Sequence, residues 1–135
     1  MTPAKSVLSI APASAVIRAA DLERAKHFYG ETLGLRLRDI PGRQGEVQVL
    51  AGDGTLVCIY ERPTTAAPVN TTLCFEVPDV AAAVAALRIR GVVFQEYDMP
   101  ETGLVTQEGV AHMGEETRAW FQDSEGNILV LRQRR

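Results

Sequence analysis

The sequence predicts an α+β fold in which two βαβββ modules form curved mixed sheets around a cup, with the helices on the convex side. Two observations carry this prediction. A succession of strand, Asp, helix and Gly occurs twice, and three strand-like stretches follow each helix. The 135 residues suffice for one compact domain but not for two independent ones. We therefore expect a single domain, with modules at about 13–62 and 70–133 and a linker at 63–69.

The first module opens with a short apolar run at residues 15–20 that meets Asp21, a residue typical of helix N-caps. Gly34 follows as a helix stop. Between these two residues the apolar side chains recur at helical spacing. They are Leu22, Ala25, Phe28, Tyr29 and Leu33.

The second module repeats this order with a strand at residues 73–77, a cap at Asp79 and a stop at Gly91. Its helical stripe consists of Val80, Ala83, Val84 and Leu87. Further strands are expected at 35–40, 46–50 and 55–61, and at 92–97, 118–122 and 128–132.

Two further segments complete the chain. The turn residues Asp53-Gly54 and Glu125-Gly126 each precede a final strand, so the last hairpins of the two modules correspond. The longest connection, residues 99–116, contains three glycines. We expect a loop of this length to be functional or mobile, and a lid over the cup is one interpretation.

Composition narrows the class of protein. The formal net charge is −3 and the basic residues are scattered, which disfavours a nucleic-acid groove. No apolar run is long enough to cross a membrane. Two cysteines cannot form a disulfide framework and are expected to be reduced. We expect a cytoplasmic protein with a loose leader before Ala13.

Three motifs carry a family resemblance. Residues 21–29, the following Leu33-Gly34-Leu35 and the turn at 123–127 resemble signatures of the vicinal oxygen chelate superfamily, which includes glyoxalases, bleomycin resistance proteins and extradiol dioxygenases. The resemblance extends from Ser14 to Leu131. It implies the paired-module fold and, for many members, dimerisation. It leaves the activity open, because members include lyases, dioxygenases, epimerases, thiol transferases and metal-free proteins that sequester antibiotics.

The resemblance also implies where a metal would bind. Metal-dependent members place a ligand, usually His, seven residues before each capping Asp, and a Glu in the last strand of each module. These positions fall here on Ser14, Thr72, Cys58 and Val130. Two hydroxyls, a thiol and an isopropyl group do not suit a divalent ion that prefers imidazole and carboxylate. We therefore expect no metal and no other cofactor.

Alternation along the first strand of each module predicts which side chains face the cup. Ser14 shares a face with Arg18, and Thr72 shares one with Cys74 and Glu76. Arg18 and Glu76 occupy equivalent places in the two modules. Two interpretations remain open: Arg18 binds an anionic ligand group, as the resemblance to glutathione-using members implies, or it forms an ion pair with Glu76.

The remaining candidates are aromatic, imidazole and thiol groups. Tyr60 shares the face of Cys58, and His112 in the long connection could give a polar contact. Trp120 is either a platform for a ligand or part of the core. Both thiols are expected to serve as small buried hydrophobes rather than nucleophiles, because neither has a basic neighbour in sequence.

These patterns favour a metal-independent protein that binds an apolar or aromatic small molecule in its cup. The residues expected to contact the ligand are Ser14, Arg18, Cys58, Tyr60, Thr72, Cys74, Glu76, His112, Trp120 and Val130. One alternative is a glyoxalase-like or dioxygenase-like enzyme with an unusual metal site containing His112 and Glu61 or Glu76. A second alternative is a structural or regulatory module whose own side chains fill the cup. We expect a homodimer, with the cup closed either within one chain or between two.

Overall fold

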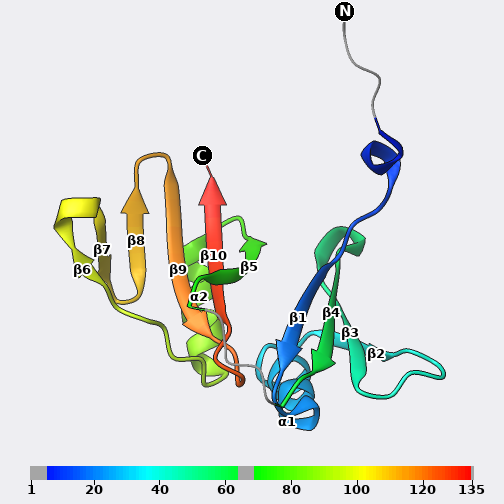
Figure 1. The fold of residues 1–135 in the computed structure, drawn as a ribbon. Helices are drawn as coiled ribbons and strands as arrows, with labels where there is room; N and C mark the ends of the chain where they lie inside the picture. Colours follow the sequence, from blue (N-terminus) through cyan, green and yellow to red (C-terminus); the bar gives the residue numbers. More distant parts are fainter. Residues whose placement is uncertain (1–5, 64–68, 135) are drawn as a thin grey trace, which may run out of the picture.

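The computed structural model describes residues 6–63 and 69–134 and has the predicted α+β fold (Figure 1). The central residues of the expected linker at 63–69 lie outside the described part. The first sheet has the strand order β1-β4-β3-β2 and the second has β5-β10-β9-β8-β7-β6. The strands of the first sheet are β1 (Ala15–Ala19), β2 (Arg36–Asp39), β3 (Glu46–Leu50) and β4 (Leu56–Glu61). The strands of the second sheet are β5 (Thr71–Glu76), β6 (Asp98–Met99), β7 (Leu104–Gln107), β8 (Val110–Met113), β9 (Glu116–Gln122) and β10 (Ile128–Arg134).

Both predicted helices form with their expected caps. In α1 (Leu22–His27) the Asp21 carboxylate accepts from the Arg24 N–H at 3.1 Å, and in α2 (Val80–Ile89) the Asp79 carboxylate accepts from the Ala82 N–H at 3.1 Å. The first helix continues as a π-helical turn, η2 (Phe28–Thr32). Short 3-10 turns lie at η1 (Val7–Ile10), η3 (Gly52–Gly54) and η4 (Pro100–Thr102).

Strand register supports the internal repeat. Strands β1 and β4 pair in parallel, as do β5 and β10, so that Val16 lies opposite Cys58 and Cys74 lies opposite Val130. The helix starts also match, because the last strand of each module caps its helix with a side chain. Glu61 accepts from the Leu22 N–H at 2.9 Å, whereas Gln133 accepts from the Val80 N–H at 2.8 Å. The predicted correspondence of Cys58 with Val130 is therefore confirmed.

The second module departs from the prediction between its helix and β9. The expected strand at 92–97 forms only one bridge, from Phe94 to Phe121. The expected loop at 99–116 is wrong, since it contains η4 and the β7–β8 hairpin. Its turn has φ of 50° at Glu108 and 82° at Gly109. Two positive φ values are typical of a type I′ turn, where Asn or Asp usually stands in place of Glu, so the turn carried no sequence signal.

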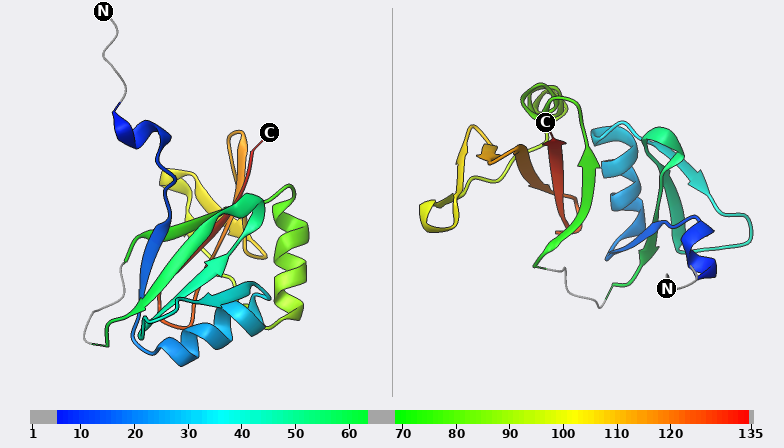
Figure 2. Two further views of the ribbon diagram at one scale, coloured as in Figure 1. Left: turned by 90° about the vertical axis from the view of Figure 1, so that its right-hand side faces the viewer. Right: turned by 90° about the horizontal axis from the view of Figure 1, so that it is seen from above.

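One hydrophobic core fills the space between the sheets. It contains Ile17 and Ile59 of the first sheet, Phe121 and Leu131 of the second, and both helices, with Tyr29 fully buried. Seen from above, α1 lies between the first sheet and β5, while α2 covers the second sheet (Figure 2). Each sheet thus buries its helix side in this core. Its opposite side, which we call the open face, is turned away.

A buried polar junction joins the modules at the turn between β9 and β10. The Tyr29 hydroxyl donates to Asp123 at 2.7 Å, and the Asn127 side-chain amide donates to Asp123 at 2.8 Å and to the Arg18 carbonyl at 2.9 Å. The same turn reaches the start of α1, where Glu125 accepts from the Asp21 N–H at 2.9 Å and pairs with Arg24 at 2.7 Å. Burial and the charge of Asp123 raise the pKa of Tyr29, so this phenol remains a donor.

Tyr29→Phe should lower the free energy of unfolding by about 1.5–3 kcal/mol, because it removes a buried hydrogen bond to a carboxylate. Tyr60→Phe is the control, since no hydrogen bond of the Tyr60 hydroxyl is found among the described residues and its ring is only half-buried. Urea unfolding of both variants measures the difference. Equal stability of the two variants would contradict the importance of the junction.

Acid should weaken the junction through Glu125. Burial alone would raise the pKa of Glu125, but hydrogen bonds from Arg24, the Asp21 N–H and Ser124 outweigh it and lower the pKa to about 2. A carboxylate with a depressed folded pKa stabilises the fold above its unfolded pKa of about 4.3. This contribution, on the order of 2 kcal/mol, is lost as the pH falls toward 2.

The corresponding measurement is urea unfolding between pH 6 and pH 2. Glu125→Gln should flatten the dependence on pH, whereas Glu23→Gln should leave it unchanged, because the Glu23 side chain is 85% exposed and pairs with Lys26 at a distance of 3.6 Å. The same pH dependence in wild type and Glu125→Gln would show that the contribution of this carboxylate is negligible.

Candidate functional site

Register defines the two open faces by residue. Side chains that alternate with the buried Val47, Val57 and Ile59 form the open face of the first sheet. It consists of Val16, Arg18, Arg36, Arg38, Glu46, Gln48, Leu50, Leu56, Cys58 and Tyr60. The open face of the second sheet includes Thr72, Cys74, Glu76, Ala111, Met113, Glu116, Arg118, Trp120, Ile128, Val130, Arg132 and Arg134.

The structure separates the ten predicted site residues into groups. Arg18, Cys58 and Tyr60 lie on the open face of the first sheet, and Ser14 is exposed just before β1. Five others share the open face of the second sheet, namely Thr72, Cys74, Glu76, Trp120 and Val130. His112 lies on neither open face. Because both open faces point away from the core between the sheets, one chain does not bring the two groups together.

The open face of the second sheet has an apolar floor. Trp120 is 8% exposed, Val130 6% and Ala111 0%, and they form a cluster separate from the main core. The Tyr97 ring meets the Trp120 ring edge to face, with the centroids 5.5 Å apart. Leu104, Met113 and Ile128 pack around the cluster. Trp120 is thus a packed residue of this apolar floor rather than of the main core. Its role as a platform for a ligand stays a prediction.

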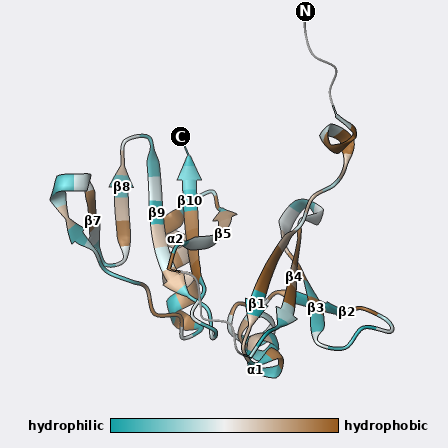
Figure 3. Cartoon of the chain, in the orientation of Figure 1, coloured by the Kyte–Doolittle hydropathy of each residue, from teal (hydrophilic) through white to brown (hydrophobic). Residues whose placement is uncertain are grey.

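Charged side chains occupy one end of this face, where the hydrophilic ends of β9 and β10 lie side by side (Figure 3). Arg132 donates to Glu76 at 2.8 Å, and Arg118 donates to Glu116 at 2.8 Å. The hydrogen bond from Arg132 holds the pKa of Glu76 below its usual value. Arg118 and Arg132 were not among the predicted site residues, although alternation from Trp120 and Val130 places them on the same face.

The structure excludes one of the two interpretations of Arg18. Glu76 pairs with Arg132, so the ion pair between Arg18 and Glu76 is wrong. Arg18 is 8% exposed and its Nη2 donates to the Glu125 carbonyl at 2.8 Å. Its Nε and Nη1 have no partner among the described residues. The Arg18 guanidinium therefore binds the turn between β9 and β10 of the second module. Its contact with a ligand remains a prediction.

The two cysteines differ in burial. Cys58 is half-buried, but Cys74 is exposed, so the expectation of a buried thiol is wrong for Cys74. Partial burial of the sulfur raises the pKa of Cys74, and nearby Arg132 offsets this only in part. The Cys74 thiol is therefore protonated at neutral pH, whereas nucleophilic attack requires the thiolate.

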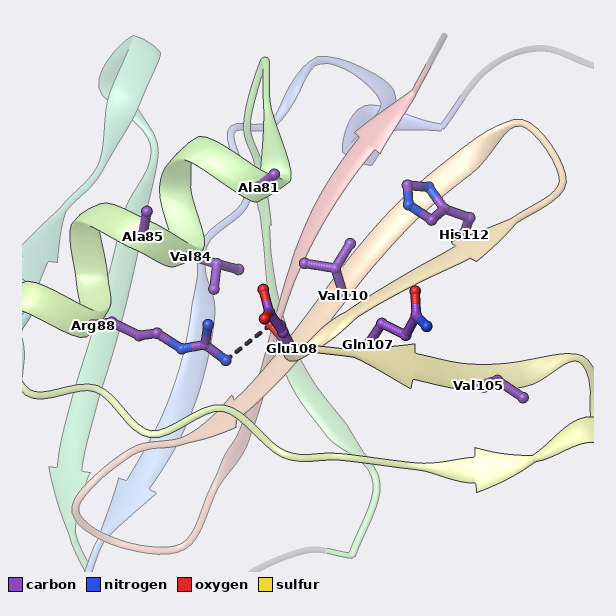
Figure 4. A pocket seen from close by; sticks show the side chains of 9 residues that line it. All are labelled: Ala81, Val84, Ala85, Arg88, Val105, Gln107, Glu108, Val110 and His112. Atoms are coloured by element: carbon purple, nitrogen blue, oxygen red, sulfur yellow. Dashed lines mark hydrogen bonds between the residues drawn. The ribbon is translucent and has the colours of Figure 1, made fainter.

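His112 lies on the helix side of the second sheet, because it alternates with Ala111. It lines a groove of about 770 Å³ between α2 and the β7–β8 hairpin (Figure 4). Arg88 closes one end of this groove by donating to the Glu108 carbonyl at 2.8 Å. The predicted polar contact of His112 inside the cup is therefore not supported by its position.

A second cavity, of about 460 Å³, lies between the modules. It is bounded by the start of β1, the turn before β4 and the edge strand β5. Its walls are mainly small and apolar, and its acidic groups are Asp53 and Glu76. It includes Cys74 and Glu76 of the predicted site, so the second module contributes candidates to this cavity as well as to its open face.

The donor set does not suit the metal that the resemblance implies. Ser14, Thr72, Cys58 and Val130 occupy the expected positions in both modules, and they offer no imidazole or carboxylate. Within residues 6–63 and 69–134, no three His, Cys, Asp or Glu side chains gather to hold an ion. The alternative ligands are also apart, since His112 faces α2, Glu61 caps α1 and Glu76 binds Arg132.

In the part of the chain that the structure describes, no helix is both long enough and apolar enough to cross a bilayer.

Known proteins with similar sequences or folds indicate the family of this chain. A search of curated proteins gave no match. Among solved structures, TnmS3, an antibiotic binding protein from Streptomyces sp. CB03234, is 29% identical with a TM-score of 0.68, over 93% of this chain and 98% of that one. A glyoxalase/dioxygenase from Nostoc punctiforme is 14% identical with a TM-score of 0.67, over 100% and 99% of the two chains.

A glyoxalase/bleomycin resistance protein/dioxygenase from Nocardioides is 20% identical with a TM-score of 0.63, over 92% of this chain and 84% of that one. At such identities the last two structures show a shared fold. Residues 11–131 match the sequence profile of one family over most of the chain. The chain belongs to the Glyoxalase/Bleomycin resistance protein/Dioxygenase superfamily.

Proposed function

We propose that this protein is a metal-independent binder of apolar or aromatic small molecules. The observation that carries the proposal is the apolar floor around Trp120 on a face whose metal-ligand positions hold no imidazole or carboxylate. Concave apolar surfaces with a few polar groups are where small ligands usually bind. A planar compound that lies on this floor would contact the aromatic pair of Trp120 and Tyr97.

The likeness to TnmS3 supports binding rather than catalysis. That protein is described as antibiotic binding, and the two chains align over nearly their whole lengths. The protonated Cys74 thiol and the scattered positions of His112, Glu61 and Glu76 supply no evident nucleophile or metal centre.

Free thiols at Cys58 and Cys74 suit the reducing cytoplasm, which we propose as the protein's location.

The cup is proposed to close between two copies of the chain. Both open faces point away from the shared core, so the first sheet of one copy must face the second sheet of its partner to enclose a ligand. Val16, on the edge strand β1 of the first open face, is 61% exposed. Exposed apolar groups on such a face are typical of an interface. A homodimer would therefore contain two equivalent cups.

Binding can be measured through Trp120, the only tryptophan of the chain. Naphthalene-2-carboxamide and related uncharged aromatic compounds should bind saturably in buffer containing EDTA and change the tryptophan fluorescence. Trp120→Leu should raise the Kd about tenfold, equivalent to about 1.4 kcal/mol, because it removes the aromatic partner but keeps apolar volume. Calorimetry measures binding by this variant.

The control is Phe28→Leu, which also replaces an aromatic ring with leucine but does so at the main core on the helix side. It should bind as the wild type does. Absence of saturable binding across such aromatic compounds, or equal affinity in Trp120→Leu, would contradict the proposed site.

The dimer can be tested at Val16. Val16→Glu should convert a dimer to a monomer in sedimentation experiments, because it places a charge inside the proposed interface. Val93→Glu is the control. Val93 is 82% exposed and lies in the connection from α2 to β6, not on an open face. A monomeric wild type, or a Val16→Glu variant as dimeric as Val93→Glu, would refute closure of the cup between copies.

A further inference from the structure

We infer that the ligand is an organic anion, with an aromatic or apolar body that carries a carboxylate or similar group. This inference rests on the proposed binding function and specifies its ligand. The observation behind it is the contrast between the charge of the open faces and the charge of the whole protein.

Arginine dominates the charged positions of strands β1–β5 and β8–β10 on the two open faces. The arginines there are Arg18, Arg36, Arg38, Arg118, Arg132 and Arg134. The glutamates are Glu46, Glu76 and Glu116. The whole protein has a formal net charge of −3. Positive charge is therefore concentrated on the faces that we propose to enclose the ligand, while the rest of the protein is acidic.

The glutamates on these faces are already paired. Glu76 binds Arg132, and Glu116 binds Arg118 and lies 3.6 Å from Arg134. Glu46 pairs at 3.2 Å with Arg43, which precedes β3. These carboxylates are consequently not available to neutralise the other arginines of the open faces.

Arg36 and Arg38 hold the exposed part of the surplus charge, whereas Arg18 is buried and binds the Glu125 carbonyl. Arg38 donates to the neutral side chain of Gln48 at 2.8 Å, and neither guanidinium has an ion-pair partner among the described residues. Both residues are exposed in the single chain. If a second copy and a ligand cover this face, the arginines lose water, and an unpaired charge in such a setting is costly.

An anionic group on the ligand would remove this cost. The planar guanidinium presents paired donors that match a carboxylate, and the attraction strengthens as the cup excludes water. A basic cup on an acidic protein would also raise the local concentration of anions. The apolar floor around Trp120 favours a ligand with a hydrophobic body. The unpaired arginines and the apolar floor together favour an amphipathic organic anion.

The test compares naphthalene-2-carboxylate with naphthalene-2-carboxamide, which have similar size and differ in charge. The wild type should bind the carboxylate at least tenfold more tightly at low salt, and added salt should narrow the gap. The double variant Arg36→Gln, Arg38→Gln should bind the two compounds with similar affinity. Arg88→Gln is the matched control, because Arg88 is exposed on the helix side, and it should keep the gap.

Each outcome separates the two proposals. Equal affinity of the wild type for both compounds would overturn the anionic ligand and leave the proposed binding function intact. Binding of neither compound would remove the proposed function and this inference with it. A gap that persists in the double variant but falls in Arg88→Gln would also overturn the assignment of charge to the open faces. Displacement of the carboxylate by a single-stranded oligonucleotide at equal concentration would instead favour a nucleic-acid surface.

Discussion

The buried junction at the turn between β9 and β10 sets the relative placement of the two modules. Asp123 accepts from Tyr29 and Asn127, while Glu125 holds the start of α1 through Asp21 and Arg24. Buried polar groups of this kind are costly unless their partners are in place, so the junction favours one arrangement over others that would bury similar apolar area. Its effect is to fix α1 between the first sheet and the second module.

That placement has a consequence for binding. With the helix sides of both sheets joined in one core, the open faces cannot cover each other within the chain. The apolar floor at Trp120 and the arginines at Arg36 and Arg38 are then surfaces that a second copy and a ligand can cover. Ligand binding and dimerisation are thus coupled in our account, because the same faces serve both.

Local signals in the sequence predicted much of this fold. The caps at Asp21 and Asp79 and the alternation along β1 and β5 are short-range patterns, and the structure has them. The β7–β8 hairpin was missed because Glu108 adopts a conformation that its residue type does not indicate. Contacts between residues far apart in the sequence were harder to predict than these local patterns. Alternation places Arg18 on the correct strand face, but only the three-dimensional structure shows its guanidinium bound to the Glu125 carbonyl and Glu76 paired with Arg132.

In our account this scaffold keeps the paired modules of its family without the metal site. The decisive experiment is metal analysis of the purified protein by mass spectrometry, after equilibration with a mixture of zinc, manganese, nickel and iron(II) ions and removal of unbound ions. Our account predicts far less than one ion per chain, because Ser14, Cys58, Thr72 and Val130 offer no imidazole or carboxylate. One tightly held ion per chain would contradict it and would return the protein to the metal-dependent members of the superfamily.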